Sequence, residues 1–109
     1  MKKLLTMTAA CAMAAAMWAH EKSIVVLYEN DVHCAIDGYA RMAGLRDAIA
    51  AQDTAYVIMV SCGDFLQGGT AGALSQGQHV ADVMRSVGYQ AVTPGNHEFD
   101  YGTERMQEL

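Results

Sequence analysis

Three short polar segments hold the side chains of this chain that could carry out chemistry. They contain Asp31 and His33 in the first segment, Asp64 in the second, and Asn96, His97 and Asp100 in the third. Carboxylate, imidazole and amide groups suit divalent metal ions that accept oxygen and nitrogen ligands. The residue types therefore indicate a metal site, provided that the fold brings the three segments together.

Each of these residues also has a purely structural interpretation. Asp31 and Asp64 follow apolar runs and are typical turn residues. Asn96 follows a Pro-Gly pair and fits a turn, and Asp100 could cap a helix that begins after it. His33 taken alone is an ordinary loop histidine. The joint pattern of Asp-x-His, then Gly-Asp, then Gly-Asn-His-Glu favours a site over separate turns.

The elements that must position these segments alternate between strands and helices. Continuous apolar runs at 23–28 and 55–60 predict strands that are buried on both faces, and 90–93 predicts a shorter third strand. The order β-α-β-α-β predicts an α/β fold with a parallel sheet and right-handed crossovers. Each polar segment follows the carboxyl end of a strand, so we expect the three segments to meet at one sheet edge.

Two segments have the apolar spacing of amphipathic helices. The sides predicted to face the core consist of Tyr39, Met42, Leu45 and Ile49 in the first helix, and of Val80, Val83, Met84 and Val87 in the second. The first helix is expected to begin near Asp37, and Gly88 is the predicted C-terminal cap of the second. Another helix is expected from Glu104 onward. The Gly-rich stretch up to Gly77 is expected to be a loop.

The amino-terminal residues have the layout of a secretory signal peptide. Two lysines precede an apolar run at 4–17, which is shorter than the roughly 20 residues of a membrane-spanning helix. We therefore assign 1–19 to a signal peptide and 20–109 to one incomplete domain. An exported protein, periplasmic or extracellular and without a stable membrane span, is expected. The alternative is a lipoprotein anchored through Cys11, because Thr8-Ala9-Ala10-Cys11 resembles a lipoprotein cleavage box.

Removal of the signal peptide would leave an acidic chain. Two of the 7 basic residues lie in it, so 5 remain against 12 acidic residues and the formal charge is −7. This charge argues against a nucleic-acid polymer as a partner and is compatible with cation binding or with solubility alone. Cys34 and Cys62 remain as well. Packing or a disulfide is expected for both, with zinc binding as the alternative.

The three polar segments resemble the motifs of calcineurin-like metallophosphoesterases. The resemblance is greatest to the branch of 5'-nucleotidases, UDP-sugar hydrolases and 2',3'-cyclic nucleotide phosphodiesterases. It is carried by Asn30-Asp31-Val32-His33, Gly63-Asp64-Phe65-Leu66-Gln67-Gly68 and Gly95-Asn96-His97-Glu98-Phe99-Asp100. The resemblance implies that 20–109 form the N-terminal part of a metallophosphatase domain, the front β-α-β-α-β portion of a truncated αββα sandwich.

The resemblance also implies two divalent metal ions, and the ligand types do not distinguish Zn, Mn, Fe and Co. The implied ligands are Asp31 and His33 for one ion, Asp64 as a bridge between both, and Asn96 for the second. His97, supported by Asp100, would assist phosphoryl transfer. Further metal-binding histidines would lie in motifs beyond Leu109, so these residues alone are expected to bind metal poorly and to be inactive. Glu98 is expected to hold the loop backbone through hydrogen bonds, and Phe99 to pack beneath the loop.

The implied activity is hydrolysis of nucleotides or related phosphate esters by a water molecule that two metal ions activate. One alternative is a nucleotide-sugar pyrophosphatase or cyclic phosphodiesterase of the same fold. Another is a secreted, non-catalytic α/β binding module whose acidic loops hold a structural cation. The motifs do not specify the nucleotide base of the substrate, the type of phosphate ester or the oligomeric state.

Overall fold

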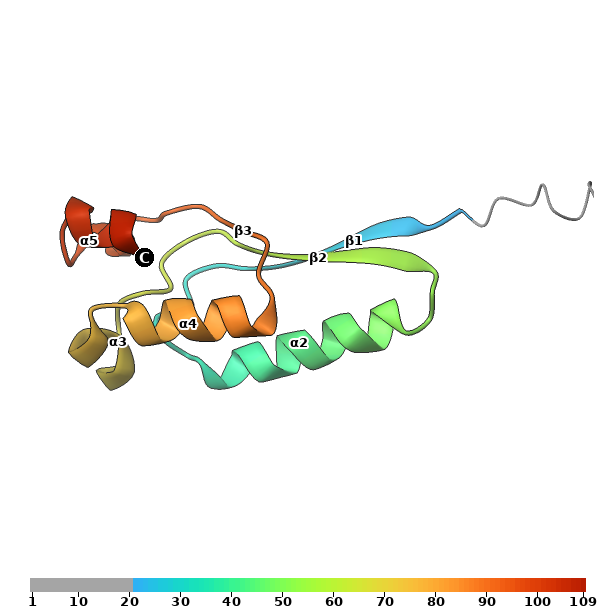
Figure 1. The fold of residues 1–109 in the computed structure, drawn as a ribbon, viewed down its shortest axis with the longest axis horizontal. Helices are drawn as coiled ribbons and strands as arrows, with labels where there is room; N and C mark the ends of the chain where they lie inside the picture. Colours follow the sequence, from blue (N-terminus) through green and yellow to red (C-terminus); the bar gives the residue numbers. More distant parts are fainter. Residues whose placement is uncertain (1–20) are drawn as a thin grey trace, which may run out of the picture.

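A three-stranded parallel sheet is the central element of the computed structural model, which describes residues 21–109 (Figure 1). The sheet order is β1 (Ser23–Glu29), β2 (Ala55–Ser61) and β3 (Ala91–Val92). The predicted α/β class and parallel sheet are confirmed. The third strand is shorter than predicted, because only Val60 and Ser61 of β2 pair with it. The predicted signal peptide and Cys11 lie outside the described residues.

Helices connect the strands and follow the last one. They are α2 (Asp37–Ala50), α3 (Thr70–Ser75), α4 (Gln78–Val87), the 3-10 helix η1 (His97–Phe99) and α5 (Thr103–Glu108). Both α2 and α4 lie on the same face of the sheet (Figure 1). The expectation of a continuous loop up to Gly77 is wrong, since α3 forms within it; a helix this short has too few turns to show a period. Within residues 21–109, no helix is long and apolar enough to cross a bilayer.

The core lies between the sheet and the helices α2 and α4. Met59 of β2 and Val80 of α4 are fully buried, and the ring of Tyr39 packs edge-on against Tyr89 with 5.5 Å between the ring centroids. The predicted apolar side of α4 is confirmed, since Val80 and Met84 are buried. Its predicted end is confirmed too, because Gly88 caps the helix with a left-handed φ of 88°.

The core-facing side predicted for α2 is wrong at one position. Leu45 is 48% exposed, whereas the neighbouring Arg46 is half-buried. The Arg46 guanidinium donates hydrogen bonds to the backbone carbonyl of Val87, at the end of α4, and to Asp47. An arginine can cover apolar surface with its stem while its head satisfies helix-terminal carbonyls, which apolar spacing does not report.

The other face of the sheet is exposed in the part of the chain that the structure describes. Its large side chains are those of Ile24, Val26, Tyr28, Tyr56 and Ile58. The prediction of strands buried on both faces is therefore wrong within residues 21–109, because helices of this segment cover one face only. The αββα sandwich implied by the resemblance would place a second sheet on this apolar face.

We expect Met59→Ala to lower the free energy of unfolding of the full-length protein by about 3 kcal/mol, because it opens a cavity in a closed core. Chemical denaturation followed by circular dichroism measures this change. Leu74→Ala is the control, since Leu74 is 83% exposed, and its effect should stay within about 0.5 kcal/mol. Equal losses in the two variants would contradict the assigned core.

Candidate functional site

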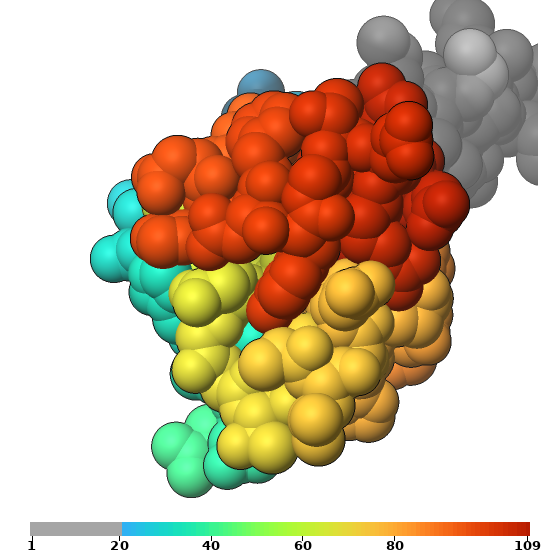
Figure 2. Space-filling view, turned by 90° about the vertical axis from the view of Figure 1, so that its left-hand side faces the viewer, coloured from blue at the N-terminus to red at the C-terminus, as the bar shows by residue number. Residues whose placement is uncertain are grey.

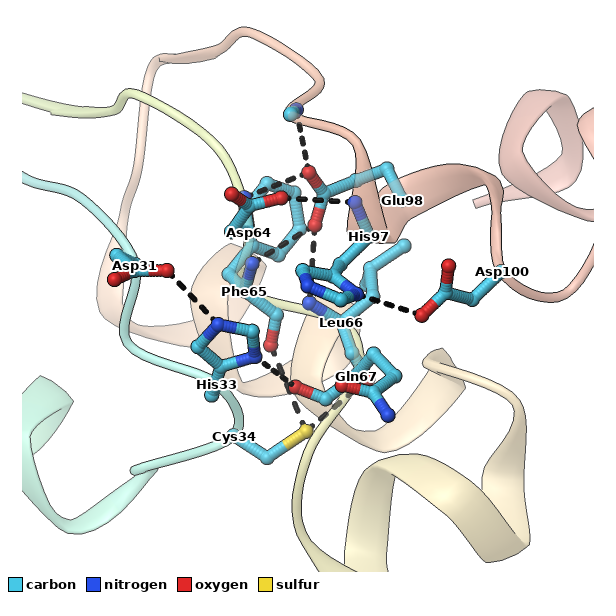
Figure 3. A network of polar contacts seen from close by, with 11 residues as sticks. Asp31, His33, Cys34, Asp64, Phe65, Leu66, Gln67, His97, Glu98 and Asp100 are labelled. Carbon is cyan, nitrogen blue, oxygen red and sulfur yellow. Dashed lines mark hydrogen bonds and ion pairs between the residues drawn. The ribbon is translucent and has the colours of Figure 1, made fainter.

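The three polar segments meet at the carboxyl ends of the strands, as expected (Figure 3). The first two continue the pairing of β1 and β2 beyond the sheet: the His33 N–H donates to the Asp64 carbonyl over 3.0 Å, and the Cys34 N–H to the Phe65 carbonyl over 3.2 Å. Figure 2 shows this end of the molecule, where the C-terminal part (orange to red) lies against the segment after β2 (yellow). The fold thus supplies one platform for the predicted site residues.

In the first segment, Asp31 and His33 form a pair. The Asp31 Oδ1 atom lies 2.8 Å from Nε2 of His33, and both side chains are partly open to solvent. Both residues adopt left-handed backbone conformations, with φ of 63° and 44°. Such values are uncommon outside glycine and recur at functional sites. The backbone therefore places a carboxylate oxygen and an imidazole nitrogen side by side at the exposed edge.

In the second segment, Asp64 is packed against the third. Its Oδ1 atom accepts the backbone N–H of His97 over 2.8 Å. A Cβ atom added at Gly95 would lie 2.3 Å from the same oxygen, and one added at Gly63 would lie 2.4 Å from the Gly95 nitrogen. Side chains at either glycine would push the segments apart. The Gly-Asp and Gly-Asn pairs of the sequence therefore reflect close backbone contact.

The Glu98 carboxylate joins the second and third segments. It is almost fully buried, and it accepts four backbone N–H groups: those of Asp64 (2.7 Å), Phe65 (2.8 Å), Leu66 (3.1 Å) and Gly95 (2.6 Å). The expected anchoring of the loop backbone is confirmed. The expected packing of Phe99 is wrong, since it is 44% exposed. In η1 the Glu98 side chain points inward, and the side chain of Phe99 points toward solvent.

In the third segment, His97 and Asp100 form a second pair. The His97 Nδ1 atom lies 2.7 Å from Oδ2 of Asp100. This hydrogen bond is the main cause that raises the pKa of His97. Desolvation lowers the pKa, and the negative charges of Asp100, Asp64 and Asp31 raise it further. The alternative of Asp100 as a helix cap is wrong, because α5 begins at Thr103 with Gly102 as its N-cap.

The two imidazoles of the site also face each other. The rings of His33 and His97 lie 4.8 Å apart between centroids, at 69°. They come from the first and the third segment and carry the Asp31 and Asp100 contacts on their outer sides (Figure 3). The two segments are more than sixty residues apart in the sequence. Their ring contact places the two histidine–carboxylate pairs, Asp31 with His33 and His97 with Asp100, in one site.

The predicted ligands are only partly assembled. Asn96 is exposed, and its side chain does not cap η1. No group of three or more His, Cys, Asp and Glu side chains within residues 21–109 is arranged so that it could hold a metal ion. The structure thus pairs two of the four predicted ligands, Asp31 with His33, and places Asp64 against the third segment.

The two cysteines of the described chain are free thiols. Cys34 is buried and its Sγ lies 3.1 Å from the Leu66 carbonyl, whereas Cys62 is exposed. The expectation of packing or a disulfide is confirmed for Cys34, which packs, and is wrong for Cys62, which is exposed and forms no disulfide with Cys34. Sequence reasoning missed two contacts of His33, with the Gln67 carbonyl and with Gly68. The only sequence signal for them is the Gln-Gly pair that ends the second motif.

We expect Glu98→Gln to lower the free energy of unfolding by about 3 kcal/mol, because one carbonyl oxygen cannot accept four backbone N–H groups and the new NH₂ faces donors. Chemical denaturation of the full-length protein measures the loss. Glu104→Gln is the matched control: Glu104 is exposed, so a change within about 0.5 kcal/mol is expected. A Glu98 variant as stable as the wild type would show that the four hydrogen bonds do not hold the segments.

Comparison with known protein families matches residues 24–109 to the family described as calcineurin-like phosphoesterase. Among characterised proteins, the 5'-nucleotidase of Bos taurus is 30% identical over 114 residues, which covers 87% of this chain and 20% of that protein. The snake venom 5'-nucleotidase of Gloydius brevicauda is 30% identical over 94 residues, or 72% of this chain and 16% of that protein.

A bacterial relative extends the comparison. The trifunctional nucleotide phosphoesterase protein of Bacillus subtilis is 32% identical over 86 residues, which covers 79% of this chain and 6% of that protein. The chain therefore spans about a fifth or less of the length of these relatives. The family match includes all three segments of the site and most of the chain, and the chain belongs to the calcineurin-like phosphoesterase family.

Proposed function

We propose that the full-length protein is a metal-dependent phosphoester hydrolase of the 5'-nucleotidase type that acts on nucleotides or related phosphate esters. The observation that carries the proposal is the meeting of two His-carboxylate pairs at one sheet edge, Asp31 with His33 and His97 with Asp100. The family match and the relatives named 5'-nucleotidase support it.

The residues present fit divalent metal ions by their donor chemistry. The neighbouring Asp31 oxygen and His33 nitrogen are both atoms that bind such ions, at a place open to solvent. We propose that these two residues hold one ion, that Asp64 is shared between two, and that Asn96 binds the second. Such ions, when bound, supply positive charge that polarises a phosphate ester and activates water for attack.

His97 would act on the phosphoryl group directly. Its Nδ1–H donates to Asp100, so Nε2–H is the free donor of the protonated ring. The neighbouring carboxylate raises the pKa of His97 and thereby favours this protonated form. An imidazolium beside the phosphoryl oxygens would stabilise the negative charge that develops during displacement. A cation-binding module without catalysis would leave this second pair without a role.

We also propose that residues 1–19 direct export and that 20–109 open the metallophosphatase domain. The charged start and short apolar run of the first residues support an exported protein, with a lipoprotein anchored through Cys11 as the alternative. Mass spectrometry of the mature protein distinguishes cleavage near residue 19 from lipidation.

A phosphate-release assay tests the proposed function. The full-length protein should hydrolyse nucleoside monophosphates, lose this activity after chelation, and regain it when Zn, Mn, Fe or Co is added back. Assays with a nucleotide sugar and a 2',3'-cyclic nucleotide separate the related activities. Activity that survives complete chelation would contradict metal dependence, and no turnover of any ester would favour the binding module.

We expect His97→Ala to lower kcat by about 10²- to 10³-fold, because it removes a charge that acts mainly in the transition state. Metal content, measured by atomic emission, should not change, since His97 is not a proposed ligand. His79→Ala is the matched control and should retain wild-type kcat, because His79 is exposed at the start of α4. A His97 variant with wild-type kcat and full metal content would overturn the assigned role.

We expect Asp100→Asn to lower the pKa of His97 in the metal-free protein, as measured by NMR titration of its ring protons. The ion pair requires protonated His97. Its contribution to the free energy of unfolding is therefore fully present below the ordinary histidine pKa of about 6.5, and it is lost as the pH rises through the raised pKa of His97 in the folded protein. Asp100→Asn should therefore destabilise the protein more at pH 5.5 than at pH 8.5. The opposite pH trend would contradict the pairing.

A further inference from the structure

The imidazole of His33 is held from the side that faces away from Asp31. Its Nδ1 atom lies 3.0 Å from the backbone carbonyl of Gln67, in a partly buried position. A carbonyl oxygen only accepts hydrogen bonds, so Nδ1 carries a proton. The other ring nitrogen, Nε2, lies 2.8 Å from Oδ1 of Asp31. A carboxylate oxygen also accepts, so Nε2 donates to Asp31 in the metal-free protein, and a bound cation would take the place of this Nε2 proton.

Gly68 makes this contact possible. It has a φ of +131°, and a Cβ atom added there would lie 2.8 Å from both Cβ and the carbonyl oxygen of His33. A side chain at this position would therefore push the Gln67 peptide and the His33 ring apart. The chain passes directly over His33 only because residue 68 has no side chain.

The backbone that carries His33 is held in the same way. Cys34 is also left-handed, with a φ of 63°, and its Sγ lies 3.1 Å from the Leu66 carbonyl. A Cβ atom added at Gly69 would lie 3.1 Å from the Cys34 Cβ, and one added at Gly72 would lie 2.2 Å from its Sγ. The stretch 68–72 therefore encloses the His33-Cys34 turn closely.

We propose that the Gln67 carbonyl and Gly68 are positioning groups for His33: they impose the Nδ1–H tautomer and direct Nε2 toward Asp31 and a bound cation. The inference rests on the proposed function, because it assigns to His33 the role of a ligand. Hydrogen bonds to the second nitrogen of a ligating histidine fix its tautomer and orientation, and their loss typically costs about 10- to 100-fold in metal affinity.

Substitution of Gly68 tests the positioning role in the full-length, metal-free protein, with zinc as the probe. In chelator competition, Gly68→Ala should weaken zinc binding about 10- to 100-fold. Gly102→Ala is the control for backbone strain, since Gly102 also has a positive φ of +90° but no atoms within 4 Å of an added Cβ. Gln67→Ala is the control for the side chain, since it keeps the carbonyl. Both controls should retain wild-type affinity.

A direct readout of the tautomer separates this role from a general loss of stability. In the zinc-loaded protein, long-range ¹H–¹⁵N NMR should show the proton of His33 on Nδ1, with the signals assigned by comparison with His33→Gln. A proton on Nε2, or Gly68→Ala with unchanged zinc affinity, would overturn the inference and leave the proposed function standing. Wild-type protein that binds no zinc, manganese, iron or cobalt would overturn both.

Discussion

The carboxylate of Glu98 is the interaction on which the arrangement of the site depends. Four backbone N–H groups from two segments point at two buried oxygen atoms. Without this carboxylate those donors would be buried and unpaired, which is costly, so the segments after β2 and β3 are stable only together. Asp64 is one of the residues held, and His97 precedes Glu98 directly. Glu98 need not touch the substrate, yet its hydrogen bonds set the positions of Asp64, a proposed metal ligand, and of His97, which is proposed to act on the phosphoryl group.

Unfavourable backbone conformations accompany this tight connection. Asp31, His33 and Asp64 all have positive φ values, between 44° and 63°. Such conformations persist only where surrounding contacts overdetermine them. Here the contacts are the ladder that continues from β1 and β2, the glycines that allow backbones to approach, and the Glu98 carboxylate. The metal-binding atoms of the site are therefore exposed, while these contacts fix the backbone that carries them. Such a fixed backbone suits side chains that must bind a metal ion in one geometry.

Several elements of this arrangement were predictable because they depend on local chain properties. The apolar runs at 23–28 and 55–60 predicted two strands, and the spacing of Val80, Val83, Met84 and Val87 predicted α4. Leu45 and Phe99 were predicted incorrectly, since what covers a side chain depends on partners distant in sequence. In both cases a polar neighbour takes the inward position and makes a hydrogen bond with the backbone of another segment.

The sequence by itself determined the order of the three strands and of α2, α4 and α5, the polar residues at each strand end and the family motifs, because periodicity and residue type are properties of contiguous segments. Only the tertiary structure decided which atoms meet. Different segments are joined by the contact of His33 with the Gln67 carbonyl, by its ring contact with His97, and by the three donors that the second segment directs at Glu98. Such contacts depend on strand register and on the exact path of the loops, which residue type alone does not specify.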